Sequence, residues 1–323
     1  MGEVMQFRHL GDSGLRVSVI GLGCNNFGGR LTLEETRAVL HKAHDLGITL
    51  FDTSDTYGAA GGGKTGDSEI QMGQVIGAMR HDIVLATKFG NPMVPDGTKQ
   101  GGSRRYIMNA VEDSLRRLRT DYIDLYQIHS TDADTPMEET LRALDDLIRQ
   151  GKVRYIGCSN HTAWRVVEAA WTAQTCGLNR FISAQDEYSL VHRAPEADLM
   201  PALRQYGMGM LPYFPLASGL LTGKYRRNAA MPAGARLTDM QRFADLYLNE
   251  KNWTIAEKLG DFAAQRGHTM LELAFSWLLA QAPVASVIAG ATKPEQLVAN
   301  ATAGTWRLTA EELAEIDGIA GRA

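Results

Sequence analysis

The feature that most constrains the fold of this chain is a unit that recurs eight times along it. In each unit, a short apolar and β-favouring run is followed by a segment whose apolar residues recur at helical spacing. Alternating strands and helices indicate parallel strands that are joined by right-handed crossovers. Eight such units in 323 residues fit a closed barrel better than an open, doubly wound sheet. We therefore expect an α/β chain that forms a single (β/α)8 TIM-barrel domain over residues 1–323.

The expected elements follow from these patterns. A turn signal at residues 11–14 joins two short strands, 5–8 and 15–17, and predicts an N-terminal β-hairpin that acts as a lid on one end of the domain. The barrel strands are expected at residues 17–23, 48–51, 83–86, 123–128, 153–158, 181–184, 208–211 and 284–289. Helices are expected at 32–46, 67–79, 105–118, 137–149, 162–175, 196–205, 254–265, 270–280, from 294 onwards and at 310–319, so the barrel carries extra helices. Residues 218–252 are expected to form a long polar segment.

Two glycine-rich segments can be compared with nucleotide-binding motifs, and one of them leaves a nucleotide-binding alternative open. An open sheet would carry an early GxGxxG motif, but Asn26 stands where the third glycine would be. Residues 58–65 match the P-loop pattern GxxxxGK[ST]. We interpret this match as a coincidence, because the following helix is predicted to begin at Asp67 rather than at Lys64. A P-loop nucleotide hydrolase nevertheless stays an open hypothesis, and it predicts ATP binding that is lost in Lys64→Ala.

Composition excludes several classes of protein. The net charge is −4, from 33 basic and 37 acidic residues, and no basic face suggests nucleic acid. The three cysteines, Cys24, Cys158 and Cys176, show neither CxxC spacing nor an even framework, so we expect no disulfide scaffold and no metal site. The N-terminus lacks an apolar signal core, and no run of 18 apolar residues occurs. We expect a cytoplasmic protein that does not interact with a membrane.

Polar side chains follow three neighbouring strands of the expected barrel. Asp52 and Tyr57 come after the second strand, Lys88 after the third and His129 after the fourth. Taken singly, each would be interpreted as a solvated or structural residue. Because a barrel brings the C-terminal ends of its strands to one face, where catalytic residues collect, we expect these four side chains to lie together.

These four residues make chemical sense as one unit. A free tyrosine has a pKa of about 10, and a nearby ammonium group lowers it. Lys88 supplies that charge, and Asp52 fixes the ammonium by a buried ion pair. His129 can orient a carbonyl group by a hydrogen bond, and Tyr57 can protonate it as a general acid. The sequence therefore predicts reduction of a carbonyl group.

A hydride donor has to be bound, because no side chain supplies hydride. The ends of the next three strands carry groups that suit a nicotinamide. Ser159, Asn160 and Gln185 offer hydroxyl and amide groups for its carboxamide, and Tyr213 offers a ring on which it can stack.

With these residues in view, the chain resembles the aldo-keto reductase family along nearly its whole length, in its bacterial and potassium-channel β-subunit-like branches. The order Asp52, Tyr57, Lys88, His129 matches the catalytic tetrad of that family. Four further segments resemble, in turn, its hairpin, its nicotinamide strand, its pyrophosphate loop and its adenosine site. They are residues 8–18 (RHLGDSGLRVS), 155–160 (YIGCSN), 215–225 (PLASGLLTGKY) and 290–297 (GATKPEQL).

The resemblance implies a set of cofactor contacts. They are Gly23, Cys24, Asn25, Ser159, Asn160, Gln185, Tyr213, Pro215, Leu216, Ser218, Gly219, Leu220, Lys224, Gly290, Thr292, Lys293, Gln296 and Asn300. The last segment is a glycine turn into a helix N-terminus, which suits an anion. Lys293 can pair there with a 2′-phosphate, so we expect NADP(H) to bind better than NAD(H). Two departures from the family are Ala299, where glutamate is frequent, and Phe214, where serine is frequent.

The sequence thus predicts an NADP(H)-dependent enzyme that reduces an aldehyde or ketone, or oxidises the corresponding alcohol or sugar. The alternative is a cofactor-binding regulatory or channel-subunit-like module with slow turnover. The expected partner is a small carbonyl substrate, whose identity the pattern does not fix, and the oligomeric state is left open.

Overall fold

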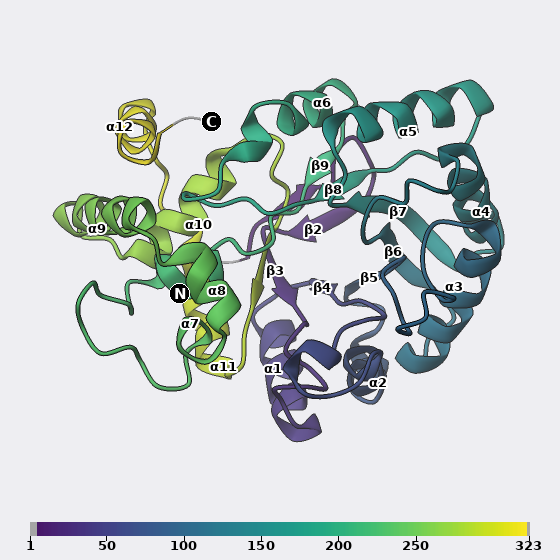
Figure 1. The fold of residues 1–323 in the computed structure, drawn as a ribbon, viewed down its shortest axis with the longest axis horizontal. Coiled ribbons are helices and arrows are strands. Elements are labelled where there is room, and N and C mark those ends of the chain that lie inside the picture. Colours follow the sequence, from purple (N-terminus) through teal and green to yellow (C-terminus); the bar gives the residue numbers. More distant parts are fainter. Residues whose placement is uncertain (1–4, 322–323) are drawn as a thin grey trace.

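The computed structural model describes residues 5–321, so the first four and last two residues of the expected domain lie outside the described part. Eight parallel strands form one curled sheet with helices around it (Figure 1). Their order in the sheet is β10-β3-β4-β5-β6-β7-β8-β9. The strands are β3 (Ile20–Gly23), β4 (Leu50–Asp52), β5 (Val84–Phe89), β6 (Ile123–Ile128), β7 (Val153–Ser159), β8 (Ser183–Gln185), β9 (Gly209–Met210) and β10 (Val287–Gly290).

Backbone hydrogen bonds between β9 and the approach to β10 join the two ends of this sheet. The amide of Met210 donates to the carbonyl of Pro283 at 3.0 Å, and the amide of Ala285 donates to Met210 at 3.0 Å. Further along, the amide of Ile288 donates to the carbonyl of Pro212 at 3.1 Å. The predicted (β/α)8 barrel is therefore confirmed.

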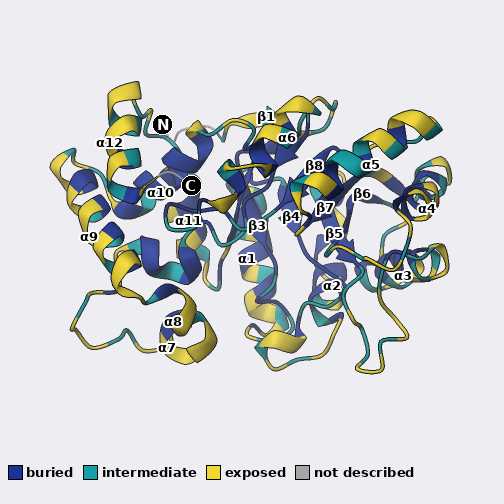
Figure 2. Ribbon diagram, turned by 45° about the horizontal axis from the view of Figure 1, so that its top comes forward, coloured by how far each residue is buried: buried dark blue, intermediate teal, exposed yellow. Residues whose placement is uncertain are grey.

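Helices cover the outside of the barrel. The longer ones are α1 (Leu33–Asp45), α3 (Arg104–Leu118), α4 (Met137–Arg149), α5 (Ala163–Cys176), α9 (Glu250–Gln265), α10 (Met270–Ala280), α11 (Pro294–Ala303) and α12 (Ala310–Ala320). The shorter ones are α2 (Asp67–Gly73), α6 (Leu199–Gln205), α7 (Arg236–Asp239) and α8 (Gln241–Tyr247), with 3-10 turns η1 (Ala59–Gly61), η2 (Ile76–Met79), η3 (Ala194–Glu196) and η4 (Ala217–Thr222). Figure 2 shows buried stripes on the helices toward the sheet and exposed residues on their outer sides, as expected for amphipathic helices. Capping boxes at Thr32, Thr269 and Thr309 fix where α1, α10 and α12 begin.

The N-terminal hairpin closes one end of the barrel, as predicted. It consists of β1 (Phe7–His9) and β2 (Arg16–Ser18), which pair antiparallel. Leu10 and Val17 are fully buried and pack in one apolar cluster with residues of the barrel strands, including Leu50 and Leu125. This apolar plug leaves the opposite end of the barrel, where the strands finish, for polar chemistry.

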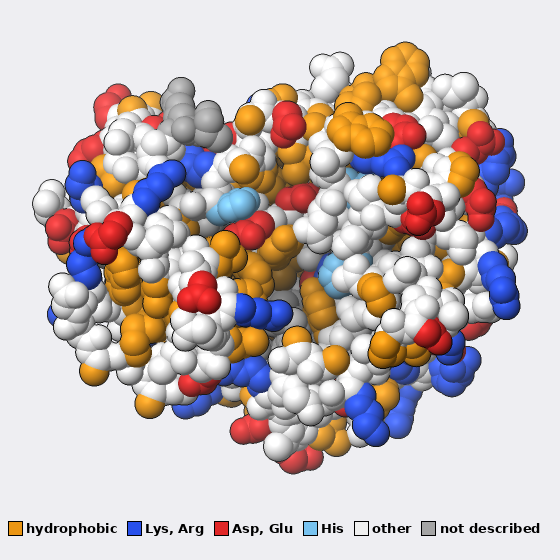
Figure 3. Space-filling view, in the orientation of Figure 1, with side chains coloured by type: hydrophobic (Ala, Val, Ile, Leu, Met, Phe, Trp, Pro, Cys, Tyr) orange, Lys and Arg blue, Asp and Glu red, His pale blue; other side chains and the backbone are white. Residues whose placement is uncertain are grey.

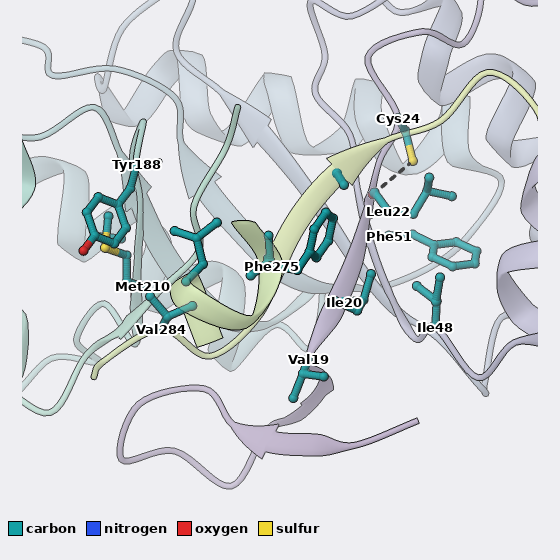
Figure 4. Close-up of a cluster of buried hydrophobic side chains, with 14 of the residues drawn as sticks. Val19, Ile20, Leu22, Cys24, Ile48, Phe51, Tyr188, Met210, Phe275 and Val284 are labelled. Carbon is teal, nitrogen blue, oxygen red and sulfur yellow. Dashed lines mark hydrogen bonds between the residues drawn. The ribbon is translucent and has the colours of Figure 1, made fainter. Parts of the chain in front are cut away.

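A second and larger apolar cluster lies between strands and helices. Figure 4 shows Ile20 and Leu22 of β3, Phe51 of β4 and Phe275 of α10 among its side chains. Leu22, Phe51 and Phe275 are all fully buried. Burial of apolar surface on this scale holds the strand ends in a fixed arrangement.

Several predicted boundaries are wrong. The expected first strand, 17–23, is divided between hairpin strand β2 and barrel strand β3. The helix expected at 67–79 is divided into α2 and η2 after Gly73, which packs so closely on α3 that a Cβ would lie 2.2 Å from the Arg117 carbonyl oxygen. The polar segment 218–252 includes most of η4, together with α7 and α8, and α9 begins at Glu250.

Candidate active site

The side chains of Asp52, Tyr57 and Lys88 meet at the C-terminal ends of β4 and β5. The ammonium of Lys88 donates to Asp52 Oδ2 at 2.6 Å, to the carbonyl of Thr53 at 2.9 Å and to the Tyr57 hydroxyl at 3.3 Å. Lys88 is fully buried, and Asp52 is only 2% exposed. The structure therefore brings these three predicted residues together, with Lys88 and Asp52 buried and Tyr57 half-buried beside them.

Two glutamine side chains hold the other oxygen of Asp52. Gln127 donates to Oδ1 at 3.1 Å from β6, and Gln185 donates to it at 2.9 Å from β8. A buried carboxylate needs such partners, because an unpaired one would be strongly destabilising. The sequence did not indicate Gln127, because it lies within a strand rather than at its end.

The charges at this site follow from burial and from the Asp52–Lys88 pair. Burial alone would lower the pKa of Lys88, but Asp52 and Tyr57 outweigh it, and the net pKa is raised. Burial also raises the pKa of Tyr57, and Lys88 offsets this only in part. The expectation that Lys88 brings the pKa of Tyr57 below its usual value is therefore corrected, because desolvation is the larger effect.

His129 lies beside Tyr57 at the end of β6. The two rings meet edge to face with their centroids 5.7 Å apart, and His129 Nδ1 lies 3.0 Å from Ser54 Oγ. Burial, together with the charge of Lys88, lowers the pKa of His129 to about 3. The imidazole is therefore neutral at physiological pH, and it can act as a hydrogen-bond donor but not as a charge.

The residues expected to face a nicotinamide form one hydrogen-bonded group. The Tyr213 hydroxyl donates to Asn160 Oδ1 at 2.8 Å, and Asn160 Nδ2 donates to the carbonyl of His129 at 2.9 Å. Ser159 Oγ donates to the carbonyl of Gln185 at 2.7 Å. The Gln185 amide itself turns to Asp52, so it links this group to the tetrad residues.

The loop after β9 carries the next predicted residues. Pro215 and Leu216 precede η4, which contains Ser218, Gly219 and Leu220. Gly219 has a φ of 107°, and a Cβ at this position would lie 3.3 Å from Lys224 Nζ. The backbone thus approaches the Lys224 ammonium closely where only glycine fits without strain.

The end of β10 carries the remaining group, next to the end of β3. Gln296 caps the start of α11, because its Oε1 accepts from the amides of Thr292 at 2.7 Å and Lys293 at 3.3 Å. Gly290 pairs with Gly23 in the sheet, and a Cβ on Gly290 would lie 3.4 Å from Asn25 Oδ1. Asn300 is buried. Cys24 is fully buried, and its amide donates to the carbonyl of Asp52 at 2.8 Å.

Two arginines that the sequence did not indicate lie near Lys224. Arg236 of α7 donates to Asn26 Oδ1 at 3.0 Å, and Arg30 lies 3.6 Å from the carboxylate of Asp239. Burial, and then the charges of Arg236 and Arg30, lower the pKa of Lys224. Such a gathering of like charges is a feature of anion sites. Figure 3 shows this face hollowed near its centre, with basic side chains and a histidine at the hollow.

The glycine loop at residues 58–66 does not present its amides to a phosphate. The amides of Gly61 and Gly63 donate to the carbonyl of Gly58 at 3.0 and 3.1 Å, and the amide of Lys64 donates to Asp67 Oδ2 at 2.7 Å. A P-loop needs such amides free, in front of a helix that begins at its lysine. Here α2 begins at Asp67, which supports the interpretation of the motif as a coincidence.

Two kinds of feature are absent from residues 5–321. No helix in this part of the chain has the length and apolar character needed to cross a bilayer. Within the same residues, no three or more His, Cys, Asp and Glu side chains form a group that could hold a metal ion.

The fold and the site define a (β/α)8-barrel protein whose strand ends hold a buried lysine and aspartate beside a half-buried tyrosine and histidine. The model of the Aldo/keto reductase family matches residues 19–320. The chain belongs to the aldo/keto reductase family.

Relatives support this assignment over most of the chain. L-glyceraldehyde 3-phosphate reductase of Escherichia coli (strain K12) is 36% identical over 324 residues, which cover 97% of this chain and 92% of that protein. A probable voltage-gated potassium channel subunit beta of Oryza sativa subsp. japonica is 36% identical over 304 residues, with 92% and 90% covered. The uncharacterized oxidoreductase YrpG of Bacillus subtilis (strain 168) is 36% identical over 300 residues, with 91% and 89% covered. Family and relatives together indicate an oxidoreductase that acts on small carbonyl compounds.

Proposed function

We propose that this protein reduces an aldehyde or ketone with hydride from NADPH, and that Tyr57 is the general acid. The observation that carries the proposal is the hydroxyl of the half-buried Tyr57, 3.3 Å from the Lys88 ammonium, with the neutral ring of His129 beside it. The reverse reaction, oxidation of the corresponding alcohol or sugar, uses the same groups. We further propose that residues 1–323 form one domain.

The chain's own residues supply the proton and hold the carbonyl group. Tyr57 transfers its proton to the carbonyl oxygen, and the Lys88 ammonium stabilises the phenolate that remains. Asp52 keeps Lys88 charged through the proton transfer, because the two form a buried pair at 2.6 Å. His129 donates a hydrogen bond to the carbonyl oxygen from the ring nitrogen opposite Ser54.

The group of Ser159, Asn160, Gln185 and Tyr213 fits a nicotinamide, because it offers amide, hydroxyl and aromatic surfaces within reach of the tetrad. When bound, the nicotinamide supplies the hydride. The loop from Pro215 to Lys224, with Arg236 and Arg30, fits a pyrophosphate, since it combines cations with a glycine that permits close approach. The site is completed by residues at the ends of β3 and β10 and by residues of α11 with its N-cap. They are Gly23, Cys24, Asn25, Gly290, Thr292, Lys293, Gln296 and Asn300. We assign the preference for NADPH over NADH to Lys293, which stands at the N-terminus of α11.

The test is a steady-state assay of NADPH oxidation against a panel of aldehydes, ketones and sugars. The panel includes a phosphorylated aldehyde, because one bacterial relative is named for such a substrate. We expect at least one carbonyl compound to be reduced by the wild type and not by Tyr57→Phe. Substantial reduction by Tyr57→Phe would refute the assignment of the acid.

A second candidate function is a regulatory module that holds the cofactor and turns over slowly. The relative named as a probable potassium channel subunit beta favours it. This module would bind NADPH tightly, yet oxidise the bound cofactor slowly with every compound of the panel.

The free cysteines, of which Cys24 and Cys158 are buried, suit a reducing compartment, and we propose the cytoplasm.

A further inference from the structure

Ser54 connects His129 to a second buried carboxyl group, Asp55. Its hydroxyl oxygen lies 3.0 Å from His129 Nδ1 and 3.2 Å from Asp55 Oδ1. The amide of Thr56 donates to the same oxygen at 3.2 Å, and the Thr56 hydroxyl lies 3.1 Å from it. Ser54 is fully buried and Asp55 is 1% exposed, so water does not compete for the contact between them, and His129 and Thr56 are half-buried.

The tautomer of His129 decides what its ring can do. A neutral imidazole carries one proton, and the partner of one nitrogen determines which nitrogen holds it. To donate to a carbonyl oxygen from Nε2, the ring has to accept a hydrogen bond at Nδ1. Only Ser54 is within reach of Nδ1 among the residues that the structure describes, and its single hydrogen cannot serve both His129 and Asp55.

The surroundings of Asp55 favour its protonated form. Glu69 of α2 holds the nearby cation, because Arg117 of α3 donates to Glu69 Oε2 at 2.6 Å. The groups that face Asp55 are otherwise hydroxyls. Tyr106 of α3 donates to its Oδ2 at 3.4 Å, and Tyr126 of β6 interacts with its charge. Burial, and then the charge of Glu69, raise the pKa of Asp55 to about 8.

We propose that Ser54 and Asp55 are positioning residues that set the tautomer of His129. Protonated Asp55 donates to Ser54 Oγ, Ser54 donates to His129 Nδ1, and the ring keeps its own proton on Nε2, where the carbonyl oxygen binds. The functional part of this inference rests on the proposed function, but the hydrogen-bond order does not.

Ionisation of Asp55 reverses the order of the hydrogen bonds. A carboxylate only accepts, so the Ser54 hydrogen turns to Asp55. The serine oxygen then accepts from His129 Nδ1, and Nε2 loses its hydrogen. The ring can no longer donate to a carbonyl oxygen, and reduction slows as pH rises through the pKa of Asp55.

The experiment is ¹⁵N NMR of the full chain labelled at histidine, from pH 6 to pH 10. The His129 signals are assigned by their loss in His129→Asn. We expect the wild type to hold the Nε2–H tautomer at pH 6 and to shift toward Nδ1–H with a midpoint near pH 8. Asp55→Asn should keep Nε2–H throughout, because its amide can donate to Ser54 at every pH.

Two serine variants complete the test. Ser54→Ala should abolish the pH-dependent shift of the tautomer, whereas Ser130→Ala, one residue from His129, should leave the shift as in the wild type. The proposal is overturned if wild-type His129 is Nδ1–H at pH 6, if its tautomer does not change with pH, or if Asp55→Asn shifts as the wild type does.

Kinetics separate this proposal from the proposed function. The kcat of the wild type should fall about tenfold or more between pH 7 and pH 10, as expected when one donor to the oxygen is lost, and Asp55→Asn should lack this fall. If the tautomer shifts as predicted but no carbonyl compound is reduced, the proposed function fails and the hydrogen-bond order stands. If reduction occurs without a shift of the tautomer, only the positioning role fails.

Discussion

Lys88 Nζ lies 2.6 Å from Asp52 Oδ2 inside the barrel, and neither residue is more than 2% exposed. Gln127 and Gln185 satisfy the other oxygen of Asp52. The pair is therefore a fully hydrogen-bonded ionic unit in which removal of one partner leaves the other buried and unpaired.

Removing Lys88 alone should destabilise the protein as well as abolish reduction. Breaking a buried pair in this way typically costs about 3–5 kcal/mol, so Lys88→Met should lower the free energy of unfolding by that order. In the double variant Lys88→Met with Asp52→Asn, much of the stability should return, while activity should not. Urea unfolding and the NADPH assay measure the two effects. Equal stability of Lys88→Met and the wild type would contradict this account of the pair.

Tyr213 should contribute to cofactor binding mainly through its ring. Tyr213→Ala removes the stacking surface, which for aromatic pairs is worth about 0.5–1.5 kcal/mol, so the Kd for NADPH should rise about twofold to twelvefold. Tyr213→Phe removes only the hydrogen bond to Asn160 and should bind nearly as the wild type does. Fluorescence titration compares the three proteins. An equal loss of affinity in both variants would assign the effect to the hydroxyl instead.

Lys293 and Arg236 should affect the two nicotinamide cofactors differently. Lys293→Ala should weaken NADPH about tenfold and NADH little, because only NADPH carries the 2′-phosphate. Arg236→Ala should weaken both, since both contain the pyrophosphate. Lys42→Ala on α1, whose side chain has no part in the proposed site, serves as the control. The assignment of Lys293 fails if its removal changes the affinities for NADPH and NADH by the same factor.

Asp186 should make stability depend on pH. Burial raises its pKa to about 8, only partly offset by the amide of Asn160, and its Oδ2 has no hydrogen-bond partner among residues 5–321. The folded state thus holds a proton that the unfolded state releases above about pH 4, so stability falls as pH rises from about 4 to 8. Asp186→Asn removes this loss.

The stability of Asp186→Asn relative to the wild type should therefore rise across that interval and level off above pH 8. The difference in the free energy of unfolding between the two proteins should rise by about 1.4 kcal/mol per pH unit, as expected when one proton is released. Denaturant unfolding at pH 5, 7 and 9 measures it. A difference in stability that does not change with pH would show that the folded protein does not hold this proton.

The sequence predicted those parts of the site that depend on where strands end. Asp52, Lys88 and His129 follow apolar runs, and barrel topology alone places such residues on one face. Gln127 escaped prediction, because a polar residue inside a buried strand gives no signal until its partner across the barrel is known. Arg236 escaped for another reason, since α7 is short and the polar segment around it shows no helical period.

The direction in which the pKa of Tyr57 shifts could be determined only from the three-dimensional structure. The sequence indicates that Lys88 is near, which lowers the pKa, but it does not indicate that desolvation of Tyr57 outweighs this effect. The close packing of Gly73 also became visible only in the structure. In sequence Gly73 looks like a tolerable helix-interior residue, yet α3 lies so close to its backbone that only glycine fits there.

The most direct test of the central claim is a single-turnover measurement on protein that already holds NADPH. Wild type and Tyr57→Phe are loaded with NADPH, mixed rapidly with a carbonyl compound that the panel has identified, and followed by the loss of NADPH absorbance. We predict that both proteins bind NADPH with similar affinity and that Tyr57→Phe oxidises it about 10²–10⁴-fold more slowly, because the proton donor alone is missing. Oxidation by Tyr57→Phe at nearly the wild-type rate would contradict the assignment of Tyr57 as the general acid.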